Sequence, residues 1–150
     1  MAPRGSPRTE SQVAEVADRV LAVVKRMPPA DALAFGIEIP TNLLAAVDEG
    51  DLSEILGNLL ENAVRFARSS IRVSATSCQD GIELTVSDDG TGIEDADKET
   101  TLARGGRLDT TGGTGLGLAI VSDIVDAYGG SLVLKDGAPG LEVLIRLPKP

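Results

Sequence analysis

Apolar residues recur at helical spacing in three stretches of the chain, with polar residues between them. The spacing predicts helices over about 13–24, 51–68 and 116–128. Pro28 ends the first helix because proline cannot continue it, and Gly129 ends the third. Asp51, with Glu54 three residues later, has the spacing of a capping box and predicts the start of the second helix.

Apolar and polar residues alternate in several shorter stretches, which is the pattern of half-buried strands. These stretches lie at about 71–76, 82–86 and 141–147, and further short strands are predicted at about 34–39, 43–47 and 131–135. The sequence QDG at 79–81 predicts a hairpin turn, and the polar, glycine-rich residues 88–115 predict one long loop. Hairpins that alternate with helices predict a two-layer α/β sandwich, with three helices on one face of a mixed, mostly antiparallel sheet.

The composition narrows the class of protein. A chain of 150 residues suits a single domain, and with only three aromatic residues its core must be aliphatic. We interpret residues 1–9 as a disordered lead or cloning remnant and residues 10–148 as the domain. A net charge of −9 repels phosphate backbones, which argues against nucleic-acid binding.

Cysteine and histidine usage limits the chemistry. The single cysteine, Cys78, permits no internal disulfide, which fits a cytoplasmic location. No apolar run reaches membrane-spanning length, so we expect no membrane contact by this domain. The chain has no histidine, so a histidine base, metal ligand or phosphoryl acceptor must come from another molecule.

The second predicted helix carries a polar stripe. Asn58, Asn62 and Arg65 lie at i, i+4 and i+7 and therefore share one face. A solvated face is one interpretation, but asparagine is a mediocre helix former and exposed faces usually prefer Glu, Lys or Gln. The two amides can offer carbonyl oxygens to a hard cation such as Mg²⁺, and Arg65 can meet a phosphate.

Two glycine-rich segments lie at the two ends of the long predicted loop. The sequence DDGTGI at 88–93 places two carboxylates and two glycines after a strand, where a tight surface turn would also explain them. The sequence GGTGLGLAIV at 112–121 leads into the third helix, whose N–H groups favour an anion, although a flexible linker is the alternative. Arg104 and Arg107 supply positive charge beside these glycines, unless they are simply solvated.

Taken together, the three segments resemble the ATP-binding catalytic domain of sensor histidine kinases, in the wider GHKL family that includes gyrase and MutL. The sequence NLLENAVRF at 58–66 is similar to the asparagine box of that family, and 88–93 and 112–121 are similar to its two glycine boxes. The sequence RGGRLD at 104–109 resembles the lid of PhoQ-type sensor kinases. The resemblance covers about residues 10–148 and implies the Bergerat fold.

The resemblance also implies residue roles. Asp88 would hydrogen-bond the adenine amino group, and Asn58 and Asn62 would hold Mg²⁺ and the phosphates. Asn58, Arg65 and Arg107 would act in catalysis. The implied ATP site consists of Asn58, Asn62, Arg65, Phe66, Asp88, Gly90, Gly92, Ile93, Arg104, Arg107, Gly113, Thr114, Gly115, Leu116, Gly117 and Leu118.

The same resemblance implies roles for further residues near the base and shows where the lid departs from the family pattern. Phe66 stands where an aromatic residue flanks the nucleotide, and Gly90 and Gly92 would let the base sit close. Asp89 is the variable position of the glycine-box pattern, and we expect it to be solvated. The lid departs from the family pattern at Leu102, where a phenylalanine is usual, and PhoQ-type lids tend to have an arginine near the place of Gly112.

One position favours phosphoryl transfer over hydrolysis. In the ATP-hydrolysing relatives a glutamate stands four residues before the box asparagine that precedes alanine, and it activates water. That position is Asn58 in this chain. A primary amide is not a general base near neutral pH.

The function implied by the resemblance is that of a kinase catalytic domain, which binds Mg-ATP and donates the γ-phosphoryl group to a histidine on a separate dimerisation domain. Its setting would be two-component signal transduction, with a response regulator as an indirect partner. We expect a cytoplasmic monomer, either stand-alone or the cytoplasmic part of a membrane sensor kinase. Two alternatives stay open: an anti-sigma-factor-like serine kinase of the same fold, and a nucleotide-binding interaction module without transfer activity.

Overall fold

The computed structural model describes residues 10–28, 30–90, 117–136 and 140–150. The predicted lead at 1–9 and most of the predicted loop at 88–115 lie outside these residues. In chain order the elements are β1 (Ser11–Gln12), α1 (Val13–Val24), a 3-10 turn (Ala30–Ala32), β2 (Ala34–Glu38), β3 (Leu44–Ala45), α2 (Glu49–Phe66), β4 (Ser70–Cys78), β5 (Gly81–Asp88), α4 (Gly117–Ala127), β6 (Ser131–Asp136) and β7 (Leu141–Leu147).

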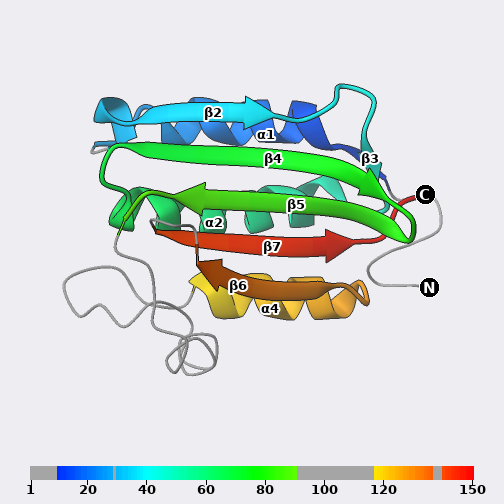
Figure 1. Ribbon diagram of the computed structural model, residues 1–150. Coiled ribbons are helices and arrows are strands. Elements are labelled where there is room, and N and C mark those ends of the chain that lie inside the picture. The colour runs from blue at the N-terminus through cyan, green and yellow to red at the C-terminus, as the bar shows by residue number, and fades with distance from the viewer. Residues whose placement is uncertain (1–9, 29, 91–116, 137–139) are drawn as a thin grey trace.

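The elements form two layers. Among the described residues, the main sheet has five strands in the order β2-β4-β5-β7-β6, and helices α1, α2 and α4 lie on one face of it (Figure 1). The β4–β5, β5–β7 and β6–β7 pairs are antiparallel, whereas β2 pairs parallel with β4. The predicted two-layer α/β sandwich with a mixed, mostly antiparallel sheet is therefore confirmed.

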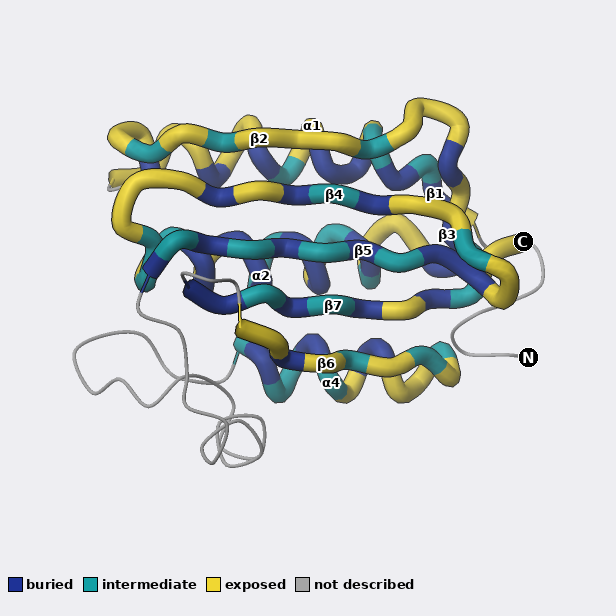
Figure 2. The backbone as a smooth tube through the Cα atoms, in the orientation of Figure 1, coloured by how far each residue is buried: buried dark blue, intermediate teal, exposed yellow. Residues whose placement is uncertain are grey.

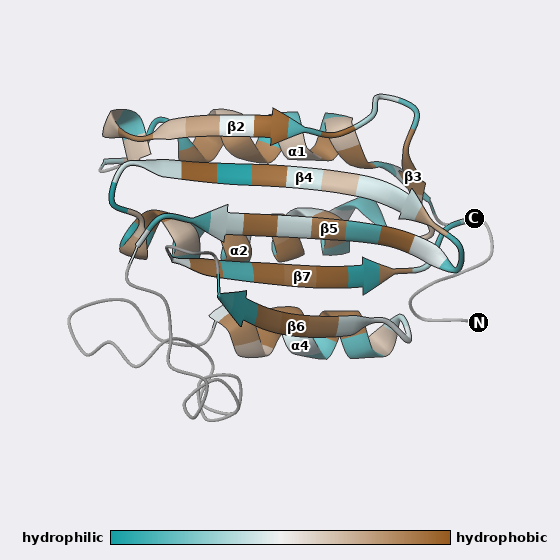
Figure 3. Cartoon of the chain, viewed as in Figure 1, coloured by the Kyte–Doolittle hydropathy of each residue, from teal (hydrophilic) through white to brown (hydrophobic). Residues whose placement is uncertain are grey.

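The strands alternate as predicted between a buried and an open face. In β4 and β5, Val73, Leu84 and Val86 are buried, whereas the intervening Ser74 and Thr85 are only partly covered (Figure 2). The same alternation is visible as bands of hydropathy along the central strands (Figure 3). The largest fully buried side chains are all aliphatic: Leu21, Leu52, Ile55, Leu56, Leu59, Leu60, Ile71, Ile82, Leu84, Leu118, Leu141 and Ile145.

Strand β3 lies outside the main sheet. It pairs antiparallel with β1, with Ser11 opposite Ala45 and Gln12 opposite Leu44. Ser11 is only 2% exposed, and its Oγ donates a hydrogen bond to the carbonyl of Val47. This small sheet therefore ties the residues before α1 to the residues that lead into α2.

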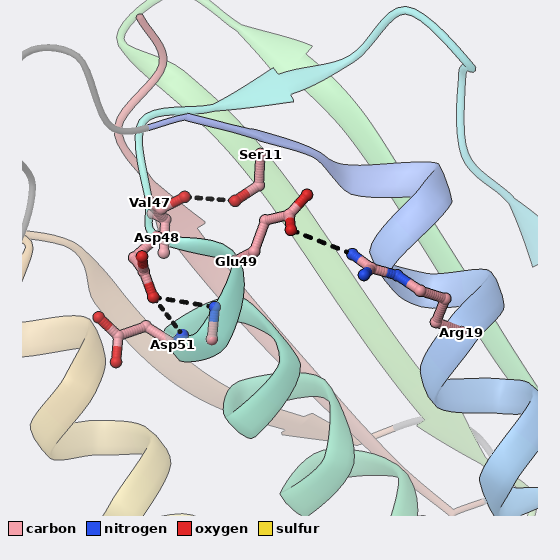
Figure 4. Close-up of polar contacts among 7 residues, drawn as sticks. Ser11, Arg19, Val47, Asp48, Glu49 and Asp51 are labelled. Carbon is pink, nitrogen blue, oxygen red and sulfur yellow. Dashed lines mark hydrogen bonds and ion pairs between the residues drawn. The ribbon is translucent and has the colours of Figure 1, made fainter.

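Helix α2 begins earlier than its capping-box pattern predicted. Its first helical residue is Glu49, and the N-cap is Asp48, whose Oδ2 accepts hydrogen bonds from the backbone N–H groups of Gly50 at 2.9 Å and Asp51 at 3.3 Å (Figure 4). Asp51 therefore does not cap the helix. Its carboxylate instead accepts a hydrogen bond from the Tyr128 hydroxyl at 2.5 Å, which connects the start of α2 to the end of α4.

The helices in the described part of the chain are too short or too polar for any of them to cross a membrane.

Candidate functional site

The predicted polar stripe of α2 contains a buried amide. Asn62 is only 7% exposed, whereas Asn58 is half-buried and Arg65 is exposed. Among the described residues, none makes a hydrogen bond to the Asn62 side chain. A buried amide without a partner loses hydrogen bonds that water would give it, so Asn62 is suited to bind a polar ligand.

The Asn58 amide has a defined orientation. Its Nδ2 donates a hydrogen bond to the Glu54 carbonyl at 2.8 Å, one turn earlier in α2. Because a carbonyl oxygen only accepts, the amide nitrogen must face Glu54 and Oδ1 must point the other way. That oxygen points to the start of α4, since a Cβ added to Gly117 would lie 3.4 Å from it.

The end of β5 contains a buried carboxylate. Asp88 is 5% exposed, and its Oδ1 accepts a hydrogen bond from the backbone N–H of Gly90 at 2.9 Å. A Cβ on Gly90 would lie 2.0 Å from the carbonyl oxygen of Phe66, so only glycine fits against the end of α2. The close approach that Gly90 permits in the structure is therefore to the backbone of Phe66.

Helix α2 thus connects the three segments that the sequence singled out. Asn58 meets the first residue of α4, and Phe66 meets Gly90 after β5. These two points are separated by about 12 Å along the helix axis. Asn62 lies between them on the helix, so amide groups line the path from the start of α4 to the end of β5.

The Asp89 side chain, which we expected to be solvated, is partly exposed but makes several hydrogen bonds within the protein. Its Oδ1 accepts hydrogen bonds from the backbone N–H groups of Arg68 at 2.8 Å, Ser69 at 2.9 Å and Ser70 at 3.1 Å. Its Oδ2 accepts from the Ser69 hydroxyl at 2.5 Å and from the Ser69 N–H at 3.1 Å. The Ser69 hydroxyl, followed by the N–H groups of Ser69 and Ser70, holds the pKa of the Asp89 carboxyl well below its ordinary value of 3.8.

A second glycine, in the connection just before β7, contacts the same strand end. Gly140 has a φ of 91°, and a Cβ there would lie 1.9 Å from the carbonyl oxygen of Asp88. Both the backbone conformation and the close contact require glycine. The residue pair Asp88 and Asp89 is therefore held on the α2 side by hydrogen bonds and on the β7 side by backbone packing.

The structure describes only some of the predicted site residues. Phe66 is half-buried at the end of α2, and Leu118 is fully buried in the core, so only its backbone N–H can face a ligand at the start of α4. The remaining predicted residues lie outside the described part: Gly92, Ile93, Arg104, Arg107, Gly113, Thr114, Gly115 and Leu116. The two departures from the family's lid pattern, at Leu102 and Gly112, also lie outside the described residues.

The two side chains that the resemblance implies as metal ligands, Asn58 and Asn62, are both amides. Across residues 10–28, 30–90, 117–136 and 140–150, histidine, cysteine and carboxylate side chains form no group of three or more that could hold a metal ion. The oxygen ligands that remain at the site are Asn58 Oδ1 and the Asn62 amide. Neutral oxygen donors suit a hard cation that also takes oxygens from a ligand.

This fold, with its amide stripe on α2 and glycine contacts at both ends, is that of a known family of ATPases. The chain belongs to the family described as histidine kinase-, DNA gyrase B-, and HSP90-like ATPase, whose model matches residues 47–150. It is a histidine kinase-type ATPase domain, as the three sequence segments predicted.

Sensor kinases are among its relatives. The chain is 43% identical over 111 residues to the sensor protein kinase CarS of Pseudomonas aeruginosa, covering 73% of this chain and 25% of CarS. It is 33% identical over 137 residues to the two-component sensor PhoQ of the same organism, covering 91% of this chain and 31% of PhoQ. The structure of the mycobacterial sensor histidine kinase MprB matches with a TM-score of 0.82 at 28% identity, covering 93% of this chain and 96% of that one. The chain thus spans a quarter to a third of the length of the two curated relatives.

Proposed function

We propose that this domain binds Mg-ATP and donates the γ-phosphoryl group to a histidine on a separate dimerisation domain, in two-component signal transduction. The observation that carries the proposal is that the two glycine segments both contact α2, the helix that carries the asparagines. Asn58 meets the start of α4 at Gly117, and Phe66 meets Gly90 beyond β5. The relatives CarS and PhoQ are named as sensors, which supports the signalling setting.

In this proposal the adenine lies at the Asp88 end of α2. The Asp88 carboxylate is buried and fixed by the Gly90 N–H, so it can accept a hydrogen bond from the exocyclic amino group of the base. An acid at this position would repel phosphates. The triphosphate must therefore extend away from Asp88, along the amide stripe toward α4.

The phosphates would lie at the other end of the stripe. The first N–H groups of α4 favour an anion, and Asn58 Oδ1 points to the same place. Asn58 and Asn62 would hold Mg²⁺ together with phosphate oxygens, and the bound ion would supply neutralisation of the phosphate charge. Arg65 is exposed one turn beyond Asn62, and its long side chain would reach back toward the N-terminus of α2 to approach the phosphates. Arg104 and Arg107 would join it from the lid.

Phosphoryl transfer requires little covalent chemistry from the domain itself. The bond from the γ-phosphorus to its bridging oxygen breaks, a bond from phosphorus to a histidine nitrogen forms, and ADP leaves. This chain contributes position and charge, which are the main sources of catalysis in phosphoryl transfer. Asn58 cannot deprotonate a water molecule, so the site favours a protein acceptor over hydrolysis.

The acceptor must belong to another domain. The chain contains no histidine, so it cannot phosphorylate itself on that residue type. We propose a helical dimerisation domain as the direct partner and a response regulator as the indirect one. Because ATP is supplied in the cytoplasm, we also place the domain there, as a monomer in isolation.

Two measurements test the proposal in sequence. Calorimetric titration with ATP should show binding that requires Mg²⁺, and a domain that binds no Mg-ATP would contradict the proposal entirely. Incubation of the Mg-ATP complex with a helical domain that carries the acceptor histidine should then yield acid-labile phosphohistidine. Tight binding without phosphohistidine would leave an interaction module, whereas acid-stable phosphoserine on a partner would identify a serine kinase.

A further inference from the structure

The residue next to the base-recognition carboxylate is unusually well anchored. Asp89 receives hydrogen bonds from four donors, the N–H groups of Arg68, Ser69 and Ser70 and the Ser69 hydroxyl. These donors belong to the junction between α2 and β4, about 20 residues earlier in the chain. A carboxylate only accepts hydrogen bonds, so four donors that converge on its two oxygens match its chemistry fully.

The neighbours of Asp89 are fixed at the same junction. Gly90 packs on the Phe66 carbonyl, and the Asp88 carbonyl packs on Gly140 of the β6–β7 connection. Three consecutive residues are thus held from opposite sides. Hydrogen bonding of Asp89 is the only side-chain anchor among these three contacts, because the other two are packing of glycines on backbone.

We infer that Asp89 is a positioning residue for base recognition: it fixes the strand end that orients Asp88, and thereby sets the preference of the site for adenine. The inference rests on the proposed function. Asp89 itself does not contact the base, because its oxygens face the Arg68–Ser70 backbone and the Ser69 hydroxyl. Its effect passes through Asp88, whose Oδ1 is placed by the Gly90 N–H one residue beyond Asp89.

The base itself provides a readout that a general loss of stability would not change. Adenine presents an amino group to Asp88, whereas guanine presents a carbonyl oxygen at the same ring position, which a carboxylate repels. Displacement of Asp88 should therefore weaken ATP binding but not GTP binding. A merely structural role for Asp89 would weaken both nucleotides in parallel.

The experiment compares Asp89→Asn with the unchanged domain, using Kd values for Mg-ATP and Mg-GTP measured well below the unfolding temperature. An amide oxygen can replace Oδ1, but the amide nitrogen then stands where Oδ2 accepts the Ser69 N–H and hydroxyl, so the junction loses part of its match. We expect the ATP-over-GTP preference to fall about tenfold, which is the loss of one hydrogen bond to a charged group. GTP affinity should stay within about twofold.

Two further variants keep the result interpretable. Ser69→Ala removes one donor and leaves the backbone donors, so it should fold normally and reduce the ATP preference by about threefold, the effect of one lost hydrogen bond. Asp123→Asn makes the same chemical change on the exposed face of α4 and should leave the ATP preference unaltered.

The outcomes separate the inference from the function on which it rests. If the unchanged domain binds no Mg-ATP, the proposed function fails and the inference fails with it. If the domain prefers ATP and both Asp89→Asn and Ser69→Ala keep that preference, the function stands and the inference is wrong. Should Asp89→Asn fail to fold, Ser69→Ala alone decides.

Discussion

The two halves of α2 use polar residues in opposite ways. At its start, Asp48 caps the helix, Ser11 bonds the Val47 carbonyl, and Glu49 pairs with Arg19 at 3.4 Å (Figure 4). In its second half, Asn62 is buried without a hydrogen bond to any described residue, and the Asn58 oxygen points to the start of α4. The polar groups at the start hold the fold, whereas we propose that those of the second half bind a ligand.

The difference has a general physical basis. A polar group that finds its partners inside the protein contributes to stability, and its removal is felt in the free energy of unfolding. A buried polar group without partners destabilises the fold and is retained when a bound molecule satisfies it. Substitutions in the two halves of α2 should therefore separate stability from nucleotide binding.

The largest effect is expected at Asp88, where the second half of α2 meets β5. In Asp88→Asn the amide oxygen is needed by the Gly90 N–H, so the amide nitrogen faces the adenine amino group and two donors meet. Affinity for Mg-ATP, measured by calorimetry, should fall by about 30-fold. An unchanged affinity would contradict the proposed contact between Asp88 and the adenine base.

Next in size is Asn62→Ala. We expect Mg-ATP affinity to fall by about tenfold or more, because a buried ligand for Mg²⁺ or phosphate is lost. Stability in urea should stay constant or rise by about 0.5 kcal/mol, since alanine forms helices better and no internal hydrogen bond is removed. The matched control is Asn42→Ala, which removes an exposed amide in the turn before β3. A large loss of stability in urea with unchanged Mg-ATP affinity would instead indicate that Asn62 stabilises the core and does not bind the ligand.

The opposite result is expected at the start of α2. Asp48→Ala removes the N-cap and should lower the free energy of unfolding by about 1 kcal/mol in urea titrations. Mg-ATP affinity should change by less than about twofold because the cap lies several turns from Asn58. Asp48→Asn retains a capping acceptor and should keep most of the stability. If Asp48→Ala lost ATP binding with an unchanged free energy of unfolding, the proposed difference between the two halves of α2 would be wrong.

The smallest effect is expected from the ion pair at the same end. Arg19 and Glu49 are 56% and 52% exposed, so solvent screens their attraction. Arg19→Gln should lower the free energy of unfolding by no more than about 0.5 kcal/mol, and high salt should abolish the difference. A loss that persisted in high salt would indicate a packing role for the arginine stem on α1.

Elements with a long repeating pattern were predictable. Helix α1, the β4–β5 hairpin and the closing strands β6 and β7 follow directly from apolar spacing, because each buries a regular face. The start of α2 was misplaced because Asp51 and Glu54 match a capping box, while the helix continues backward through Gly50 to the real cap at Asp48. Local sequence cannot rank two acids that compete for one helix end.

The candidate site was predictable where its motifs are local and not where they depend on tertiary contacts. Spacing placed Asn58 and Asn62 on one helix face, and the resemblance singled out Asp88; their ligand-binding roles stay predictions. Asp89 was misjudged because its donors at Arg68–Ser70 come from a different junction of the chain. Gly140 carried no signal at all, since its close contact with Asp88 exists only once β7 pairs with β5.

The parallel pairing of β2 with β4 has a consequence for the order of assembly. The hairpin β4–β5 closes over a two-residue turn, whereas β2 can dock only after the whole of α2 has been placed between it and β4. Contacts between residues close in sequence form faster than contacts that close long loops. We therefore expect β2, an exposed edge strand, to be the last part of the sheet to form and the first whose backbone amides exchange with solvent.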